Sequence, residues 1–156
     1  METVQYHTGD IITARVHKLP FLFHMGIIVT GLPVESQVQI YPLPPEQEPE
    51  PVFVWHNTPN NRNSAGGSVL KTLLSDWVKT RTVIRVVPSN LTKEYIDLTA
   101  TAFDHRHFNW FTFNCEHFVY LIWTGEPRSP QLAFWSILAG TLAAVCLIRK
   151  KNRKGI

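Results

Sequence analysis

One cysteine and its polar neighbours are the strongest candidates for chemistry in this chain. Residues 113–119 read Phe-Asn-Cys-Glu-His-Phe-Val, and an apolar run continues from there to Gly125. The pattern predicts a helix that begins at Cys115, with Asn114 as its N-cap. Free backbone N–H groups and the positive end of the dipole at a helix start favour a thiolate over a thiol. The sequence therefore predicts that Cys115 is a nucleophile.

A nucleophilic cysteine needs a base within hydrogen-bond reach and a group that orients the base. His24 lies within the apolar stretch 21–30, and His56 ends the apolar stretch 52–56. Two such strands can pair as a hairpin, which would bring the imidazoles together, and the helix of Cys115 can then pack on the sheet. We therefore predict a Cys–His–His set, in which the backbone N–H of Cys115 helps to hold an oxyanion.

A zinc site is the competing interpretation of the same region. His105, His107, Cys115 and His117 are four possible ligands. If a helix starts at Cys115, however, this side chain and that of His117 point to nearly opposite sides and do not converge on one ion. We expect neither a metal nor a cofactor.

The charge of the chain argues against a nucleic-acid partner. The formal net charge is +3, and the last eight residues contribute +5 to it, which leaves −2 for residues 1–148. The basic residues are thus a terminal patch, not a folded basic face.

The chain has two cysteines, which favours a reducing compartment over a disulfide framework, and its N-terminus has no signal-peptide pattern.

The order of the predicted elements indicates one α+β domain over residues 1–128. The expected strands are 9–16, 21–30, 52–56 and 82–87, and the expected helices are 68–78 with Ser68 as N-cap, 92–104 with Thr92 as N-cap, and the helix from Cys115. Residues 31–51 are rich in proline and glutamate, which predicts an exposed inserted loop with a short strand at 37–41.

An uncharged apolar segment, 131–148, follows the domain, and a basic tail, 149–156, follows the segment. As a helix the segment is about 26 Å long, close to the thickness of a bilayer core, about 30 Å. The alternative, a last core helix, would normally show a polar face, and this segment has none. We expect a single-pass C-terminal membrane anchor with the domain in the cytosol; a helix that lies in the membrane interface stays open.

The residues around the cysteine resemble a known family. The block 114–119, Asn-Cys-Glu-His-Phe-Val, is similar to the signature of the lecithin:retinol acyltransferase-like family, which includes the H-Rev107-type phospholipase/acyltransferases. Three further stretches resemble family strands in the same order: 9–12 the first strand, 24–31 the strand of the catalytic histidine, and 54–56 the strand of the second histidine. The apolar C-terminal segment with its basic end also matches the H-Rev107-type layout.

This resemblance implies a fold and a reaction. The fold would be a circularly permuted papain-like (NlpC/P60) α+β domain, with an antiparallel sheet packed on helices. Cys115 would attack a glycerophospholipid ester and form a thioester, His24 would remove and return the proton, and His56 would orient His24. Water as acceptor would give phospholipase A1/A2 activity, and a lipid amine or hydroxyl would give acyl transfer.

Two features depart from the family pattern. Met25 follows His24 where the family often has an aromatic residue, and 31 residues separate His24 from His56, where the family hairpin is usually much shorter.

Two other functions stay open at this point. One is a thiol peptidase or amidase on the same fold, and the other is a non-catalytic membrane-tethered interaction protein that presents residues 31–51 as a proline-rich ligand.

Overall fold

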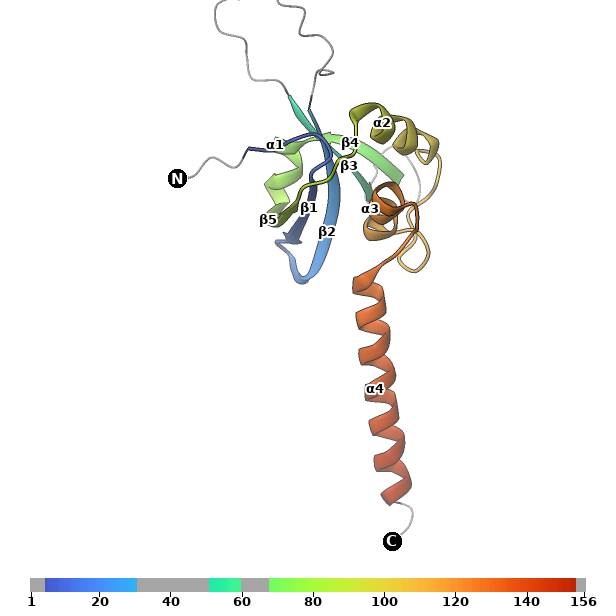
Figure 1. Ribbon diagram of the computed structural model, residues 1–156. Helices are drawn as coiled ribbons and strands as arrows, with labels where there is room; N and C mark the ends of the chain where they lie inside the picture. Colours follow the sequence, from blue (N-terminus) through green and yellow to red (C-terminus); the bar gives the residue numbers. More distant parts are fainter. Residues whose placement is uncertain (1–4, 31–50, 60–67, 154–156) are drawn as a thin grey trace, which may run out of the picture.

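A computed structural model describes residues 5–30, 51–59 and 68–153 of the 156-residue chain as a mixed α+β structure. A five-stranded antiparallel sheet has the order β4-β3-β2-β1-β5 (Figure 1). Its strands are β1 (Ile11–Val16), β2 (Leu19–Thr30), β3 (Val52–Thr58), β4 (Ser68–Leu73) and β5 (Arg81–Val87). The predicted strand at 37–41, and all but the last residue of the predicted loop 31–51, lie outside the described residues.

The central strand β2 is the longest, and it is buried from His24 to Val29, within the apolar stretch 21–30 that was predicted to be a strand. It pairs with β3 as an antiparallel neighbour, in a register that places Ile27 opposite Trp55, so the predicted hairpin is confirmed. The two strands approach closely at Gly26, where an added Cβ would lie 2.3 Å from Val54 Cγ1. A glycine at this position therefore permits the close β2–β3 contact beside His24.

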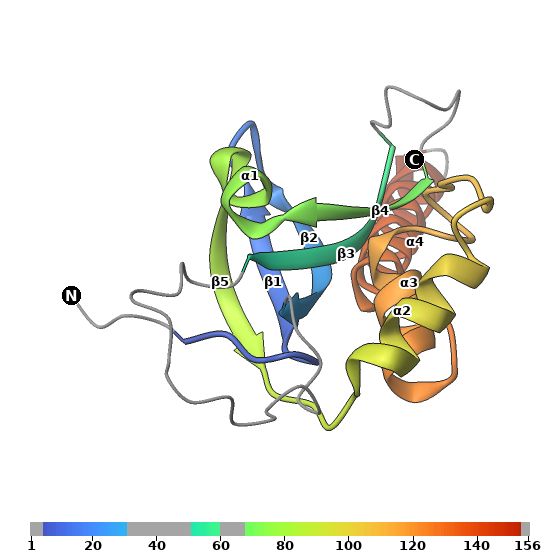
Figure 2. The same ribbon diagram turned by 90° about the horizontal axis from the view of Figure 1, so that it is seen from above.

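Each face of the sheet has its own apolar core. On one face, α2 (Lys93–Ala102) and α3 (Cys115–Thr124) pack against the sheet, as Figure 2 shows from above. The core there includes Ile27, Ile96 and Phe118. On the other face, the short helix α1 (Leu74–Trp77) inserts Trp77 among Ile12, Ile28 and Val54, and a 3-10 turn (Val78–Thr80) follows it.

The predicted helix at 68–78 is wrong over most of its length. Ser68 is not an N-cap but the first residue of β4, which pairs with β3 from the Thr58–Ser68 pair to the Phe53–Leu73 pair. Only four residues after β4 form α1. The free edge of β3 offers backbone hydrogen bonds over the whole length of β4, and this non-local pairing outweighs the local helical spacing of the apolar residues.

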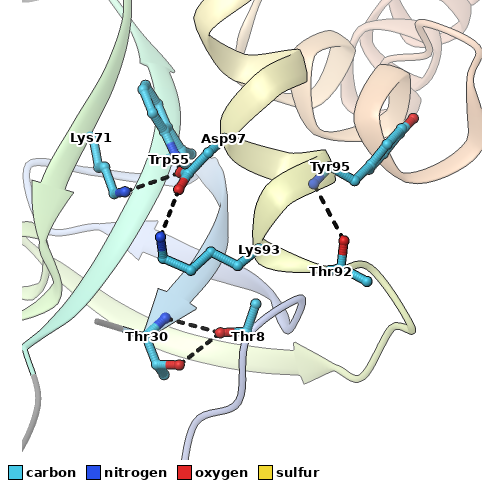
Figure 3. A network of polar contacts seen from close by, with 8 residues as sticks. All are labelled: Thr8, Thr30, Trp55, Lys71, Thr92, Lys93, Tyr95 and Asp97. Atoms are coloured by element: carbon cyan, nitrogen blue, oxygen red, sulfur yellow. Dashed lines mark hydrogen bonds and ion pairs between the residues drawn. The ribbon is translucent and has the colours of Figure 1, made fainter. Parts of the chain in front are cut away.

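Helix α2 begins where it was predicted, with Thr92 as N-cap accepting a hydrogen bond from the backbone N–H of Tyr95. Asp97 attaches this helix to the sheet (Figure 3). Its carboxylate accepts hydrogen bonds from Trp55 Nε1 at 2.6 Å, Lys71 Nζ at 3.0 Å and Lys93 Nζ at 3.1 Å. The network joins α2 to both β3 and β4.

The C-terminal helix α4 (Pro130–Arg153) projects away from the domain (Figure 1). Its span Pro130–Lys150 has 21 residues, a mean hydropathy of 1.9 and no buried share, so it is long and apolar enough to cross a membrane. At about 1.5 Å per residue the span is about 31 Å long, longer than the predicted segment 131–148. The alternative of a last core helix is wrong, because α4 does not pack into the domain.

Candidate active site

The start of α3 has the predicted geometry. Asn114 Oδ1 accepts a hydrogen bond from the backbone N–H of His117 at 3.1 Å, and His117 Nδ1 accepts one from the backbone N–H of Asn114 at 3.3 Å. Gly125, with φ +77°, ends the helix in the left-handed conformation that favours glycine. This reciprocal capping places Cys115 in the first turn of α3.

A buried asparagine attaches this helix start to the sheet. Asn57 follows His56 in β3, and its Nδ2 donates a hydrogen bond to the backbone carbonyl of Phe113 at 2.7 Å. Phe113 stands two residues before Cys115. The bond therefore sets the start of α3 relative to the strand that carries His56.

Cys115 and His24 line one cavity, of about 630 Å³. Both side chains are buried, and Cys115 Sγ lies 3.9 Å from the backbone carbonyl oxygen of Phe23, the residue before His24. Apolar and aromatic residues form much of the wall, including Leu22, Phe108 and Trp110. Cavities of this size and lining are typical of sites for small apolar ligands.

The two histidines form the predicted pair. His24 Nε2 lies 3.0 Å from His56 Nδ1, and His56 Nε2 lies 3.0 Å from Thr72 Oγ1. The ring of Trp77 lies beside both, with centroid distances of 5.7 Å to His24 and 6.3 Å to His56. His56 does not line the cavity, and its contact with a lining residue is the one to His24.

Both histidines are neutral at physiological pH. Burial lowers the pKa of His24 well below its usual value, and the nearby His56 and Arg81 lower it further. Burial, with a smaller effect of Arg81, lowers the pKa of His56 to about 3. If His24 Nε2–H donates to His56, and His56 Nε2–H donates to Thr72, the Nδ1 of His24 keeps its lone pair. In that tautomer His24 is ready to accept a proton.

The thiol of Cys115 is protonated at physiological pH. Burial raises its pKa to about 11, although the backbone N–H of Met25 opposes this shift, and the charge of Glu116 adds to it. The expectation that the helix start makes Cys115 a thiolate is therefore wrong for the free site, since desolvation outweighs the helix-start N–H groups. Attack by this cysteine requires proton removal during the reaction.

The neighbours of Cys115 have structural partners instead. Glu116 Oε2 accepts hydrogen bonds from Ser129 Oγ at 2.5 Å and from the backbone N–H of Gln131 at 2.9 Å. His117 closes the capping box of α3. His105, another candidate zinc ligand, is mostly exposed. Within the ranges that the structure describes, no three His, Cys, Asp or Glu side chains are grouped as metal ligands.

Sequence reasoning missed two residues of the site. Thr72 supports His56 but was assigned to a helix, where it would have had no relation to β3. Arg81 lines the cavity at the start of β5, and its residue type alone gives no signal that it is partly buried in a cavity wall. Residues 68–73 read Ser-Val-Leu-Lys-Thr-Leu, which has no apolar/polar alternation, so the sequence held no period-two signal for a strand at Thr72.

The arrangement combines a cysteine at a helix start with a neutral histidine that lines the same, largely apolar cavity, and these features together suit acyl transfer through a thioester. The roles of Cys115, His24 and His56 stay predictions. The predicted proline-rich ligand falls almost wholly on residues 31–50, outside the described ranges. No family model, curated protein or solved structure matches this chain.

Proposed function

We propose that this protein is a membrane-anchored, cysteine-dependent phospholipase A1/A2 and acyltransferase that acts on glycerophospholipids. Its domain would have the circularly permuted papain-like (NlpC/P60) fold that the resemblance to the lecithin:retinol acyltransferase-like family implies. The observation that carries the proposal is the single cavity lined by Cys115, by His24 and by residues of α4.

The first half-reaction transfers an acyl group to the cysteine. His24 Nδ1 accepts the proton of the Cys115 thiol as Sγ attacks the ester carbonyl carbon. The oxyanion that forms lies near the start of α3, where the backbone N–H of Cys115 is a donor. The tetrahedral intermediate then expels the alcohol oxygen of the lysolipid, which takes the proton back from His24, and the acyl group remains on Sγ as a thioester.

The second half-reaction regenerates the thiol. Water, or a lipid hydroxyl or amine, gives a proton to His24 as its oxygen or nitrogen attacks the thioester carbonyl. Collapse of the intermediate expels the sulfur, which is protonated by His24. The product is a free fatty acid when water is the acceptor, and an ester or amide when a lipid hydroxyl or amine is the acceptor.

The position of α4 supports a substrate that comes from a membrane. Leu132 and Trp135, in the first turns of α4, line the same cavity as Cys115. Leu19, Trp110 and Phe111 line it too and are exposed, so they border its mouth. Exposed aromatic and apolar side chains next to a candidate span suit the membrane interface. A lipid could then enter the cavity without crossing water.

The test is to incubate the full-length protein with phosphatidylcholine vesicles and to measure lysolipid, free fatty acid and acylated protein by mass spectrometry. We expect lysolipid release, and an acyl group on the peptide that contains Cys115. Cys115→Ala should abolish both signals. Cys146→Ser should leave both unchanged, because Cys146 is exposed on α4 and outside the cavity. Absence of lysolipid and of acyl-enzyme with the unmodified protein would exclude this function.

A further inference from the structure

Among the described residues, one positively charged side chain lies in the wall of the cavity. Arg81, the first residue of β5, lines it together with Cys115. Its Nη1 donates hydrogen bonds to the backbone carbonyl of Trp77 at 2.8 Å and to Thr80 Oγ1 at 3.1 Å. Its Cζ lies 5.1 Å from the centroid of the Trp77 ring. The hydrogen bonds of Nη1 and the contact with the Trp77 ring therefore hold the guanidinium in place.

This cation has no anionic partner in the described part of the chain. None of the ion pairs there includes Arg81, and its Nε is buried without a hydrogen-bond acceptor. The carboxylate in the cavity wall, that of Glu116, accepts hydrogen bonds from Ser129 and Gln131 instead. A partly buried, unpaired guanidinium is costly, and an anion that enters the cavity would relieve this cost.

The electrostatics of Arg81 connect it to the nucleophile. Burial lowers the pKa of the Arg81 guanidinium, and the negative charge of a Cys115 thiolate opposes this shift. An anionic group that binds next to Cys115 would thus attract the Arg81 guanidinium electrostatically.

We propose that Arg81 binds the phosphodiester of the glycerophospholipid and thereby selects phosphate-bearing lipids over neutral glycerolipid esters. This inference rests on the proposed function. Guanidinium groups bind phosphate oxygens through paired, charge-assisted hydrogen bonds. In a glycerophospholipid, the carbon that bears the phosphate is next to the one that bears the sn-2 ester. With the ester carbonyl at Cys115, the phosphate remains inside the cavity that Arg81 lines.

The first experiment compares two monomeric substrates of equal chain length, dihexanoylphosphatidylcholine and dihexanoylglycerol, on the full-length protein. We expect Arg81→Gln to lower kcat/KM for the phospholipid about 10- to 100-fold more than for the neutral lipid, as loss of a charge-assisted hydrogen bond to phosphate does. The ratio of the two losses is the quantity compared, because Arg81 also lowers the pKa of His24 and its removal changes the chemistry for both substrates. Arg81→Lys should be intermediate on the phospholipid. Arg85→Gln is the matched control, since Arg85 is exposed on the same strand and does not line the cavity.

Equal losses on both substrates would overturn the inference, since they would mean that Arg81 serves the thiol or the oxyanion. Arg81→Lys keeps the charge and extends the comparison if Arg81→Gln fails to fold, which thermal unfolding would reveal. With Arg81→Lys alone, a loss confined to the phospholipid still supports phosphate binding.

A second readout separates this inference from the proposed function. If the unmodified protein cleaves neither lipid, the proposed function fails, and binding is measured by alkylation of Cys115 with iodoacetamide in a Cys146→Ser background. Protection by dihexanoylphosphatidylcholine but not by dihexanoylglycerol, lost in Arg81→Gln, would support a phosphate site. No protection, or equal protection in Arg81→Gln, would overturn it.

Discussion

At the scale of single residues, the cavity holds its two main groups in uncharged forms. The pKa of Cys115 is raised to about 11 by burial, and that of His24 is lowered by burial and by its neighbours. A preformed thiolate–imidazolium pair is therefore disfavoured in the free protein. In the proposed reaction, the thiol would instead transfer its proton to His24 while it attacks.

The first prediction concerns the protonation of Cys115. In a Cys146→Ser background, the rate of alkylation by iodoacetamide should rise with pH toward about pH 11. At pH 7 the reactive thiolate would be on the order of one part in 10⁴, against a few per cent for an unperturbed cysteine. The measurement is the rate constant from pH 6 to 11 by intact-mass spectrometry. A plateau reached below pH 7 would contradict the raised pKa.

The second prediction concerns Thr72, whose Oγ1 lies 3.0 Å from His56 Nε2. Thr72→Val removes the acceptor for His56 Nε2–H, so His56 can carry its proton on Nδ1 and donate to His24. The proton of His24 then moves to Nδ1, the nitrogen that should be the base. We expect kcat to fall about tenfold at unchanged KM, the effect of one lost hydrogen bond.

Thr72→Ser is the control for this change, because it keeps the hydroxyl and should keep kcat near that of the unmodified protein. Both constants are measured with monomeric dihexanoylphosphatidylcholine. A loss of kcat in Thr72→Ser equal to that in Thr72→Val, or a rise of KM alone, would mean that Thr72 does not set the histidine tautomer.

At this scale the sequence predicted which residues lie together, but not the protonation of Cys115. Residue types and spacing were enough to select Cys115, His24 and His56, because a capped helix and two apolar strands have strong local signals. The direction of the Cys115 pKa shift was missed, since a helix start is visible in a sequence and the depth of burial is not. Thr72 and Arg81 could not be predicted from the sequence, because only tertiary packing brings them to the site.

At the scale of elements, too, the features with local sequence signals could be predicted and those that depend on distant parts of the chain could not. The strand β2 and its pairing with β3 were predictable from two apolar runs, and α3 from a cap, an apolar run and a glycine. The strand β4 was not, because its stability comes from the edge of β3 and not from its own sequence. The error matters for the candidate site, since β4 carries Thr72, the hydrogen-bond partner of His56.

The third prediction tests how α2 is attached to the sheet. Burial raises the pKa of Asp97, but hydrogen bonds from Trp55, Lys71 and Lys93 outweigh this effect, and the net pKa lies below the ordinary value of 3.8. A carboxyl with a lowered folded-state pKa stabilises the fold above the unfolded-state pKa, and this contribution is lost as pH falls through the lower, folded-state value. Asp97→Asn should therefore reduce the free energy of unfolding at pH 7 by about 1 kcal/mol, and by less at pH 3 and below.

Chemical unfolding of both proteins at several pH values measures this difference. Asp76→Asn is the control, because Asp76 pairs with Lys79 on the surface, with both side chains mostly exposed. Its effect should be near zero at every pH. The attachment through Asp97 would be refuted if Asp97→Asn and the unmodified protein differed equally at pH 7 and pH 3.

At the scale of the whole molecule, the fourth prediction concerns what holds the protein at membranes. The span Pro130–Lys150 is long and apolar enough to cross a bilayer. A truncation that removes residues 131–156 should release the protein from vesicles in a flotation assay, because the main apolar surface outside the domain is lost. Circular dichroism should show the sheet and the other helices retained. A truncated protein that still floats with vesicles would show that the domain surface, not α4, binds the membrane.

The fifth prediction concerns how α4 is joined to the site. Two residues that flank Cys115 bind the start of this helix, since Asn114 Nδ2 donates to Ser129 Oγ at 3.1 Å and Glu116 accepts from Ser129 and Gln131. Because α4 also lines the cavity, this contact should hold the mouth at the bilayer surface. Glu116→Ala should leave the protein on vesicles but reduce the turnover of vesicle phosphatidylcholine several-fold more than that of monomeric dihexanoylphosphatidylcholine.

The ratio of the two rates is the decisive quantity, because Glu116 also raises the pKa of Cys115, and removing it changes the chemistry equally for both substrates. Glu126→Ala is the matched control, since Glu126 lies in the same connection, is mostly exposed and pairs with Arg128. It should leave both the rates and their ratio unchanged. An unchanged ratio in Glu116→Ala would mean that the contact between Glu116 and α4 does not couple the anchor to the cavity, and that α4 acts only as a tether.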